Sequence, residues 1–291
     1  MNNNSTWLVR REFWENRAIW MIPAVFGGLL LLAALFGRVS IPQLTSPQEA
    51  RAAAGAFLGV IGGTFFIVMS VYSTWYLLDC LYTDRRDRSI LFWKSLPISD
   101  ASAVLIKLLV GVVIIPLVYF AAADATALLG AFILSVRARA SLGSSLWNGE
   151  VWLQMQVFWL YAILTAAIWY LPIAGWFMLM SAWAKRAVML WALLPPLLLS
   201  IFERAFFGSQ HLGHMIRERL IGLPMVALND PRYLWTHGGE VVDNAAATST
   251  NLWHLINPSG FFTSAETWIG VAVGVAFIAA AIQLRMRRSE I

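Results

Sequence analysis

Six apolar runs, each long enough to cross a lipid bilayer, limit what this chain can fold into more than any other feature. A helix needs about 20 predominantly apolar residues to cross the hydrocarbon core. Inside that core the backbone must satisfy its own hydrogen bonds, so several such runs predict a bundle of helices. The predicted spans are Ala18–Phe36, Ala53–Leu78, Val104–Ser135, Val157–Trp183, Ala187–Phe207 and Thr267–Leu284.

Composition and motifs narrow the class of protein. Of the 291 residues, 59% are hydrophobic and 13% are charged, whereas soluble domains carry about a quarter charged residues. Cys80 is the only cysteine, which excludes an internal disulfide and a cysteine cluster for zinc or iron–sulfur. The basic residues are dispersed among span ends, which is not the pattern of a nucleic-acid-binding protein. We therefore predict one all-α integral membrane domain over residues 1–291, with no nucleic-acid partner.

Enzymatic motifs are missing from the sequence. No H-E-x-x-H or G-x-S-x-G occurs, and no predicted span holds a pair of carboxylates, so an intramembrane hydrolase would have little to work with. We predict that the chain is not an enzyme and has no catalytic residues and no metal site.

The positions of lysine and arginine predict the orientation. In the short connections these residues gather before the first span, between the second and third, between the fourth and fifth, and after the sixth. Because cytoplasmic loops carry an excess of lysine and arginine, both termini are predicted to be cytoplasmic. The N-terminal segment 5–17 interleaves arginines with Trp7, Phe13 and Trp14. It is predicted to lie on the inner leaflet as an interfacial helix. The alternative is a positively charged lead-in to the first span.

The connection at 83–101 combines dense charge with a short aromatic stretch. Pro97 ends that stretch, Ser99 can cap the next helix, and Asp100 then falls in its first turn. Such an element can dock into a groove of a partner protein, but local physics equally allows an amphipathic loop lying on the headgroups. The residues predicted to contact a partner are Asp84, Arg86, Asp87, Arg88, Leu91, Phe92, Trp93, Lys94 and Leu96.

Two segments carry a resemblance to a known family. R-R-E-F-W-E-N-R at 10–17 precedes the first span, and D-R-R-D-R-S-I-L-F-W-K-S-L-P-I-S at 84–99 joins the second span to the third. This pattern resembles the type-2 ABC export permeases. In that family the second–third hairpin is the coupling helix that sits on the ATPase subunit. No G-x-x-x-x-G-K-[ST] phosphate-binding loop occurs in this sequence, so the ATPase is expected on a separate chain.

The resemblance carries several implications. It implies a multi-pass protein of the bacterial inner (cytoplasmic) membrane that works as a homodimer, or as a heterodimer, in contact with membrane lipids. Two separate ATPase subunits would bind ATP and Mg, and this chain would bind no cofactor. The expected activity is export of an amphipathic drug, peptide or lipid-like molecule. Two other classes stay open, namely an ATP-independent secondary transporter and a membrane scaffold or sensor that docks a soluble partner.

The same resemblance suggests a substrate path. In the family the second and fifth spans line the dimer interface and the translocation path, although a stripe of large apolar residues more often serves helix packing. The glycine edge Gly55, Gly59 and Gly63 of the second span allows close helix approach, which favours a dimer. The substrate-path candidates are Phe65, Met69, Tyr72, Leu194, Leu198 and Phe202.

Two features have no assigned role. Asp124 lies inside the third span without an evident partner, and a wet cavity or a shallow position would explain it better than an ion relay. The segment 208–266, predicted to be extracytoplasmic, holds all four histidines. His211 and His214 have a spacing compatible with two metal ligands on a helix, although surface or interface histidines are the preferred explanation. Short apolar pieces of this segment could fold back as a lid.

Overall fold

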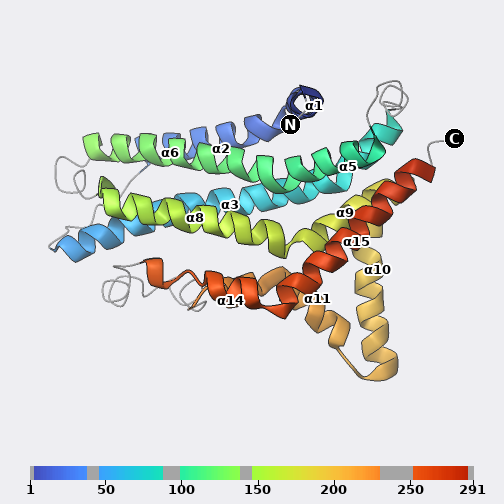
Figure 1. Ribbon diagram of the computed structural model, residues 1–291. Coiled ribbons are helices and arrows are strands. Elements are labelled where there is room, and N and C mark those ends of the chain that lie inside the picture. Colours follow the sequence, from blue (N-terminus) through green and yellow to red (C-terminus); the bar gives the residue numbers. More distant parts are fainter. Residues whose placement is uncertain (1–2, 38–45, 88–98, 138–145, 230–251, 288–291) are drawn as a thin grey trace.

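The computed structural model describes residues 3–37, 46–87, 99–137, 146–229 and 252–287. These residues form helices almost throughout (Figure 1), and the β-structure among them is limited to an isolated bridge between Leu228 and Ile256. The helices up to the middle of the chain are α1 (Asn3–Glu15), α2 (Ala18–Phe36), α3 (Pro47–Arg86), α5 (Asp100–Leu109), the π-helical η1 (Val110–Ile114), α6 (Ile115–Arg137) and α8 (Gly149–Trp169). They are followed by α9 (Leu171–Trp183), α10 (Val188–Phe202), the π-helical η2 (Glu203–Phe207), α11 (His211–Ile221), α12 (Leu223–Ala227), the 3-10 helix η4 (Leu252–His254), α14 (Pro258–Thr263) and α15 (Ala265–Arg287).

Six stretches of these helices are long and apolar enough to cross a membrane, as predicted. They are Ala18–Phe36, Pro47–Arg86, Asp100–Arg137, Gly149–Trp169, Val188–Phe207 and Ala265–Arg287. The chain is therefore an all-helical protein of the multi-pass membrane type. The second stretch has 40 residues, roughly 60 Å at 1.5 Å per residue. This is about twice the thickness of the hydrocarbon core, so α3 continues well beyond the predicted span.

Local sequence signals explain where several helices begin. The Ser46 side chain accepts a hydrogen bond from the backbone N–H of Glu49, and Pro47 follows at the start of α3. Ser99 caps α5 by accepting from the N–H of Ser102 at 3.1 Å, which confirms the predicted cap. Each cap satisfies a backbone donor that the first turn of a helix leaves free.

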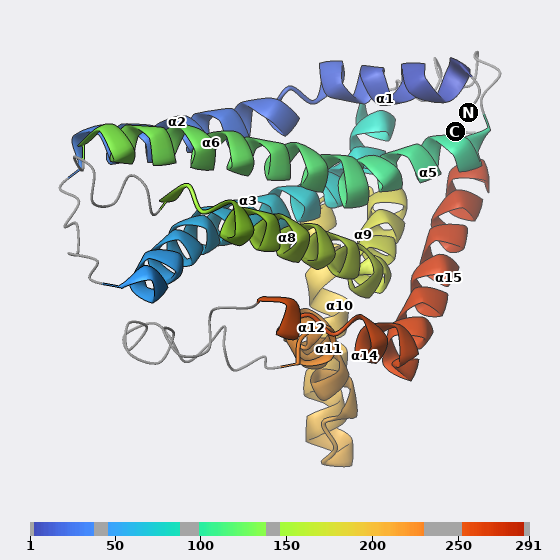
Figure 2. The same ribbon diagram turned by 60° about the vertical axis from the view of Figure 1, so that its left-hand side comes forward.

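Prolines mark two irregular places in the predicted spans. The third span is regular except at the π-helical turn η1, which ends two residues before Pro116. Proline cannot donate the backbone hydrogen bond of a regular helix, so an irregular turn is expected nearby. The fourth span breaks at Tyr170 into α8 and α9, with Pro172 in the first turn of α9. At this break the helix axis changes direction, so α9 is not collinear with α8 and packs along α15 (Figure 2).

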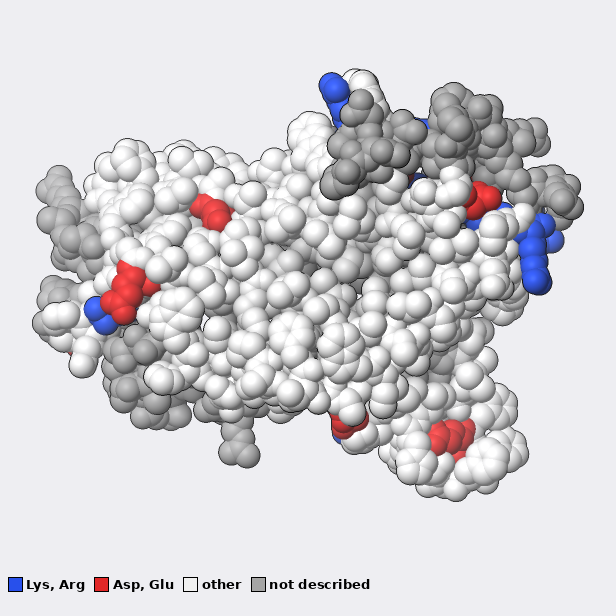
Figure 3. Space-filling model, in the orientation of Figure 1, with Lys and Arg blue, Asp and Glu red and all other residues white. Residues whose placement is uncertain are grey.

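The centre of the bundle is α3. It contacts α6, α8 and α9, while α2 packs against α6 and α15 packs against α9. The face of α3 that points inward carries Phe65, Met69 and Tyr76, all of them buried. Phe65 meets Phe26 of α2 edge to face at 5.1 Å between ring centroids. Charged side chains gather mainly toward the ends of the molecule, and most of the surface between them is uncharged (Figure 3).

The glycine edge of α3 packs within the chain. A Cβ on Gly55 or Gly59 would lie 3.8–3.9 Å from Met155 of α8, and one on Gly63 would lie 3.9 Å from the indole of Trp159. The edge that we expected to favour a second copy therefore seats α8, and it gives no support of its own to a dimer.

The helix α10 projects away from the rest of the bundle (Figure 1). Only Val188 and Ala192 of this helix are buried, against Leu78 of α3 and Met180 of α9. Beyond them its apolar side chains are largely exposed, from Leu193 to Phe207. The short helices α12 and α14 of the predicted extracytoplasmic segment pack against the last turns of α8, where Trp169 and Phe261 lie in one apolar cluster.

The N-terminal helix α1 is distinct from α2, and its place at the membrane interface stays a prediction. The two helices meet at Asn16–Arg17, and α1 contacts α5 (Figure 2). Trp7 and Trp14 are 65% and 70% exposed, and the Arg10 guanidinium lies over both rings at 5.6 and 5.1 Å. Exposed indoles beside an arginine suit the headgroup layer.

Candidate functional site

The predicted partner-binding connection is attached to two well-defined helix ends. Its first root is the end of α3 at Arg86, and its second root is Ser99 with the start of α5. At the first root, Arg86 and the following Asp87 are exposed and form an ion pair at 3.0 Å. The predicted contact residues Arg88, Leu91, Phe92, Trp93, Lys94 and Leu96 lie outside the described residues.

Beside the roots lies a cluster of charges from four helices, buried except for Asp100, whose side chain is 23% exposed. This ionic cluster consists of Glu12 (α1), Asp84 (α3), Asp100 and Lys107 (α5) and Arg285 (α15). Glu12 and Lys107 are only 2% and 4% exposed. Charges this deep persist only when they are paired and hydrogen-bonded.

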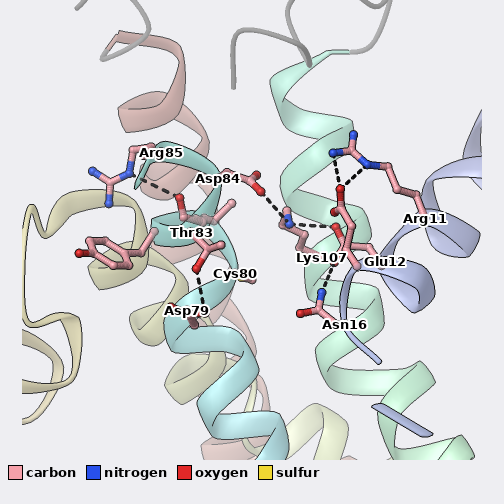
Figure 4. A network of polar contacts seen from close by, with 12 residues as sticks. Arg11, Glu12, Asn16, Asp79, Cys80, Thr83, Asp84, Arg85 and Lys107 are labelled. Carbon is pink, nitrogen blue, oxygen red and sulfur yellow. Dashed lines mark hydrogen bonds and ion pairs between the residues drawn. The ribbon is translucent and has the colours of Figure 1, made fainter. Parts of the chain in front are cut away.

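The five charged groups form a continuous chain of contacts. Lys107 Nζ lies 2.9 Å from Glu12 Oε1 and 3.2 Å from Asp84 Oδ1, so it bridges α1 and α3 (Figure 4). Arg285 continues the chain, with Nη1 at 3.0 Å from Asp84 Oδ2 and Nε at 3.1 Å from Asp100 Oδ1. Both roots of the connection are therefore tied to the same arginine of the last helix.

Neutral donors complete the Glu12 end of the cluster. The Tyr76 hydroxyl and the Asn16 amide both donate to Glu12 Oε2, at 2.8 and 3.2 Å. Three carboxylates face two cations in the cluster, so these extra donors help to stabilise the excess negative charge.

A second set of contacts fixes the end of α3 to α9. Arg85 donates to the carbonyls of Ser181 and Ala184, and the Ser181 hydroxyl accepts from the N–H groups of Leu81 and Tyr82 at 3.1 and 3.0 Å. The last turns of α3 are thus held from two sides.

Asp84 is placed differently from our expectation. We predicted it on the surface that meets a partner, but the structure buries its side chain between Lys107 and Arg285. The sequence D-R-R-D-R does not distinguish its members, and only helix phase turns Asp84 inward while Arg86 and Asp87 stay exposed.

The substrate-path candidates fall into two separate groups. Phe65, Met69 and Tyr72 are buried in the main core, where Tyr72 stacks on Tyr119 at 6.0 Å. Leu194, Leu198 and Phe202 lie on the projecting part of α10 and are 37–54% exposed. The two groups do not meet within one chain.

Asp124 has a partner that the sequence did not reveal. Gln156 of α8 donates from Nε2 to Asp124 Oδ1 at 2.7 Å. The predicted fourth span began one residue after Gln156, but α8 begins at Gly149 and brings this amide to the carboxylate. Both side chains line a small pocket of about 30 Å³ between α3, α6 and α8, the Asp124 pocket.

The predicted extracytoplasmic segment is tied to α8 and α15 by Arg219. Its guanidinium lies 4.2 Å from the centroid of Trp169, donates to the carbonyl of Glu266 at 3.0 Å, and occupies the space beside Gly270. Burial lowers the pKa of Arg219, and Glu266 partly opposes this effect. His214 contacts Glu218 at 3.2 Å, and no group of three potential metal ligands occurs in the described part of the chain.

Comparisons with known proteins add no relative: no family model, no curated protein and no solved structure matches the chain. The candidate site therefore rests on its geometry. Sequence reasoning missed Glu12, Lys107 and Arg285 as partners, because each lies at a helix end where a charged residue is ordinary. The available sequence signal was Lys107, a cation inside the predicted third span Val104–Ser135.

Proposed function

We propose that this chain is the membrane subunit of an ABC-type exporter, driven by ATP hydrolysis on separate soluble subunits. In this proposal the connection 83–101 faces the cytoplasm, and its Arg88–Leu96 stretch is the coupling element. The exporter contains two permease copies and two ATPase subunits, and it moves an amphipathic substrate out of the cell.

The observation that carries the proposal is the ionic cluster beneath the coupling element. Buried charges cost stability unless they are well paired, and here they join both roots of the same connection to α1 and α15. A loop that merely rested on the headgroups would need no such anchoring. An element that receives a force from a partner protein would need such anchoring.

The mechanism follows from this anchoring. Closure of the ATPase subunits on ATP presses on the coupling element and displaces both roots. Since α3 and α5 are tied by Lys107 and Arg285, the displacement tilts α3, α5–α6 and α15 as a unit. We propose that this movement changes the contact between two permease copies and opens the path to the outside.

The double variant Phe92→Ala/Trp93→Ala is expected to fold and reach the membrane, because the ion pairs that join α1, α3, α5 and α15 are made by other residues. It should lose ATP-dependent transport, since an aromatic pair of this kind supplies most of the binding energy of a small docking element. The measurement is ATP-driven uptake of labelled amphipathic compounds into inside-out membrane vesicles.

The matched control is Phe206→Ala/Phe207→Ala, a second pair of adjacent aromatics, 74% and 83% exposed, at the end of η2. This control should keep its ATPase partner bound. If the Phe92→Ala/Trp93→Ala variant transported at the rate of the unmodified protein, the coupling role of this connection would be wrong.

One observation favours a second candidate, an ATP-independent secondary transporter. Such transporters place ionisable groups inside their spans, and Asp124 with Gln156 is an arrangement of this kind. This alternative predicts uptake that follows an ion gradient, needs no ATP and is abolished by Asp124→Asn. Transport that requires ATP would exclude it.

A further inference from the structure

The Asp124 pocket is set apart from the rest of the intramembrane surface by its polar atoms. It lies between α3, α6 and α8, and its walls combine aromatic side chains with aliphatic ones. The aromatic residues are Phe65, Phe66, Tyr119, Phe120 and Trp159. The polar residues in this otherwise apolar setting are Asp124 and Gln156.

The carboxylate of Asp124 is only partly satisfied. It accepts one hydrogen bond from Gln156, and no cation lies within ion-pair distance of it among the described residues. A carboxylate within a membrane span is costly unless a counter-charge or water reaches it.

Two further polar groups of the pocket lack partners. The Tyr119 hydroxyl and the Trp159 indole N–H are buried and make no hydrogen bond within the described part of the chain. Tyr119 is only 1% exposed. Unpaired donors of this kind are rare in folded proteins. The Tyr119 hydroxyl can donate to an acceptor atom that enters the pocket, whereas the Trp159 N–H lies against the backbone of Gly62.

These groups together indicate the chemical features of a ligand that would bind in the pocket. A positive charge would pair with Asp124 and would be attracted by the faces of the surrounding aromatic rings. An acceptor oxygen on the same molecule would meet the donor of Tyr119. We propose that the Asp124 pocket binds an amphipathic organic cation that carries an aromatic body and a carbonyl-type acceptor.

Entry requires the pocket to widen. Its 30 Å³ hold about two water molecules, far less than an organic cation. The rim is formed by Asp124, Gln156 and Trp159, which are half-buried. Trp159 rests on the bare backbone of Gly62, so rotation of the indole together with a shift of α8 would open the pocket. This inference rests on the proposed function only in that the bound cation would be the exported substrate.

The test is direct binding to the purified protein in lipid nanodiscs, with empty nanodiscs as the blank. The probe is tritiated procaine, an aromatic ester with a protonated amine, and its binding is measured by equilibrium dialysis. Benzocaine shares the aminobenzoate ester but lacks that amine, so it should compete poorly. We expect saturable procaine binding with about one site per chain.

Two variants that should not disturb the fold probe the site. Asp124→Asn keeps the shape and the contact with Gln156, and it should weaken procaine binding by about tenfold or more. Tyr119→Phe removes only an unpartnered hydroxyl, and it should weaken binding by about threefold to tenfold. The control Glu203→Gln removes a carboxylate from the start of η2, outside the pocket, and should leave binding unchanged.

The proposal is overturned if procaine shows no saturable binding, if Asp124→Asn binds it as tightly as the unmodified protein, or if benzocaine competes as well as procaine. None of these measurements involves ATP or a partner. If procaine binding depended on Asp124 but the protein recruited no ATPase, the binding site would be supported and the exporter proposal would be contradicted.

Discussion

Replacing Lys107 with methionine is expected to destabilise the folded protein by about 3–5 kcal/mol, the range for removing one member of a buried ion pair. Methionine has a similar length but no charge, so Glu12 and Asp84 would be left buried beside each other without their shared cation. The measurement is the apparent melting temperature of the detergent-solubilised protein, followed by size-exclusion chromatography after heating.

A matched control separates the effect of losing a buried charge from the effect of losing an exposed one. Arg51 and Glu150 also join two helices through an ion pair at 2.8 Å, but their side chains are 39% and 53% exposed. Arg51→Met should therefore cost no more than about 1 kcal/mol. The double variant Lys107→Met/Glu12→Gln should recover part of the lost stability, because one uncompensated charge is removed. Equal losses for Lys107→Met and Arg51→Met would contradict the role of the ionic cluster.

Replacing Gly274 with leucine is expected to destabilise the protein by about 3 kcal/mol or more, at or above the upper range for overpacking. Gly274 lies where α15 crosses α9, the most extensive helix contact in the described bundle. A Cβ there would lie 2.8 Å from the carbonyl carbon of Leu171 and 2.9 Å from the nitrogen of Pro172. These are backbone atoms, so only a separation of the two helices could relieve the clash.

The control for this prediction is Gly28→Leu in α2. A Cβ on Gly28 would meet nothing within 4 Å, and the leucine would extend into lipid. The apparent melting temperature should therefore fall for Gly274→Leu and change little for Gly28→Leu. If the two variants melted together, the close contact of α9 and α15 would be wrong.

The helices themselves could be predicted because lipid imposes a simple requirement on sequence. The first span was predicted with the bounds that the structure has, Ala18–Phe36. The cap at Ser99 followed from side-chain chemistry alone. The ends of α3 could not be predicted, because it extends beyond the bilayer through polar residues that satisfy helix and loop equally well. The break at Tyr170 was also missed, since Pro172 can kink a span or end it.

The candidate site was predictable only in part. The connection 83–101 stands out by composition, but the partners of its roots come from residues 12, 107 and 285. A single sequence cannot indicate such distant pairs. Gln156 escaped notice because the predicted fourth span excluded it by one residue. The glycine edge of α3 was recognised as a close-packing surface, but sequence does not distinguish a neighbouring helix from a second copy.

The most direct test of the central claim is to identify what this protein binds in its native membrane. The protein would be affinity-purified in a mild detergent, and co-purifying chains would be identified by mass spectrometry. We predict a stoichiometric soluble partner that contains a phosphate-binding loop, lost from the Phe92→Ala/Trp93→Ala variant and retained by Phe206→Ala/Phe207→Ala. Recovery of this protein alone, with no ATPase under conditions that keep membrane complexes intact, would contradict the account.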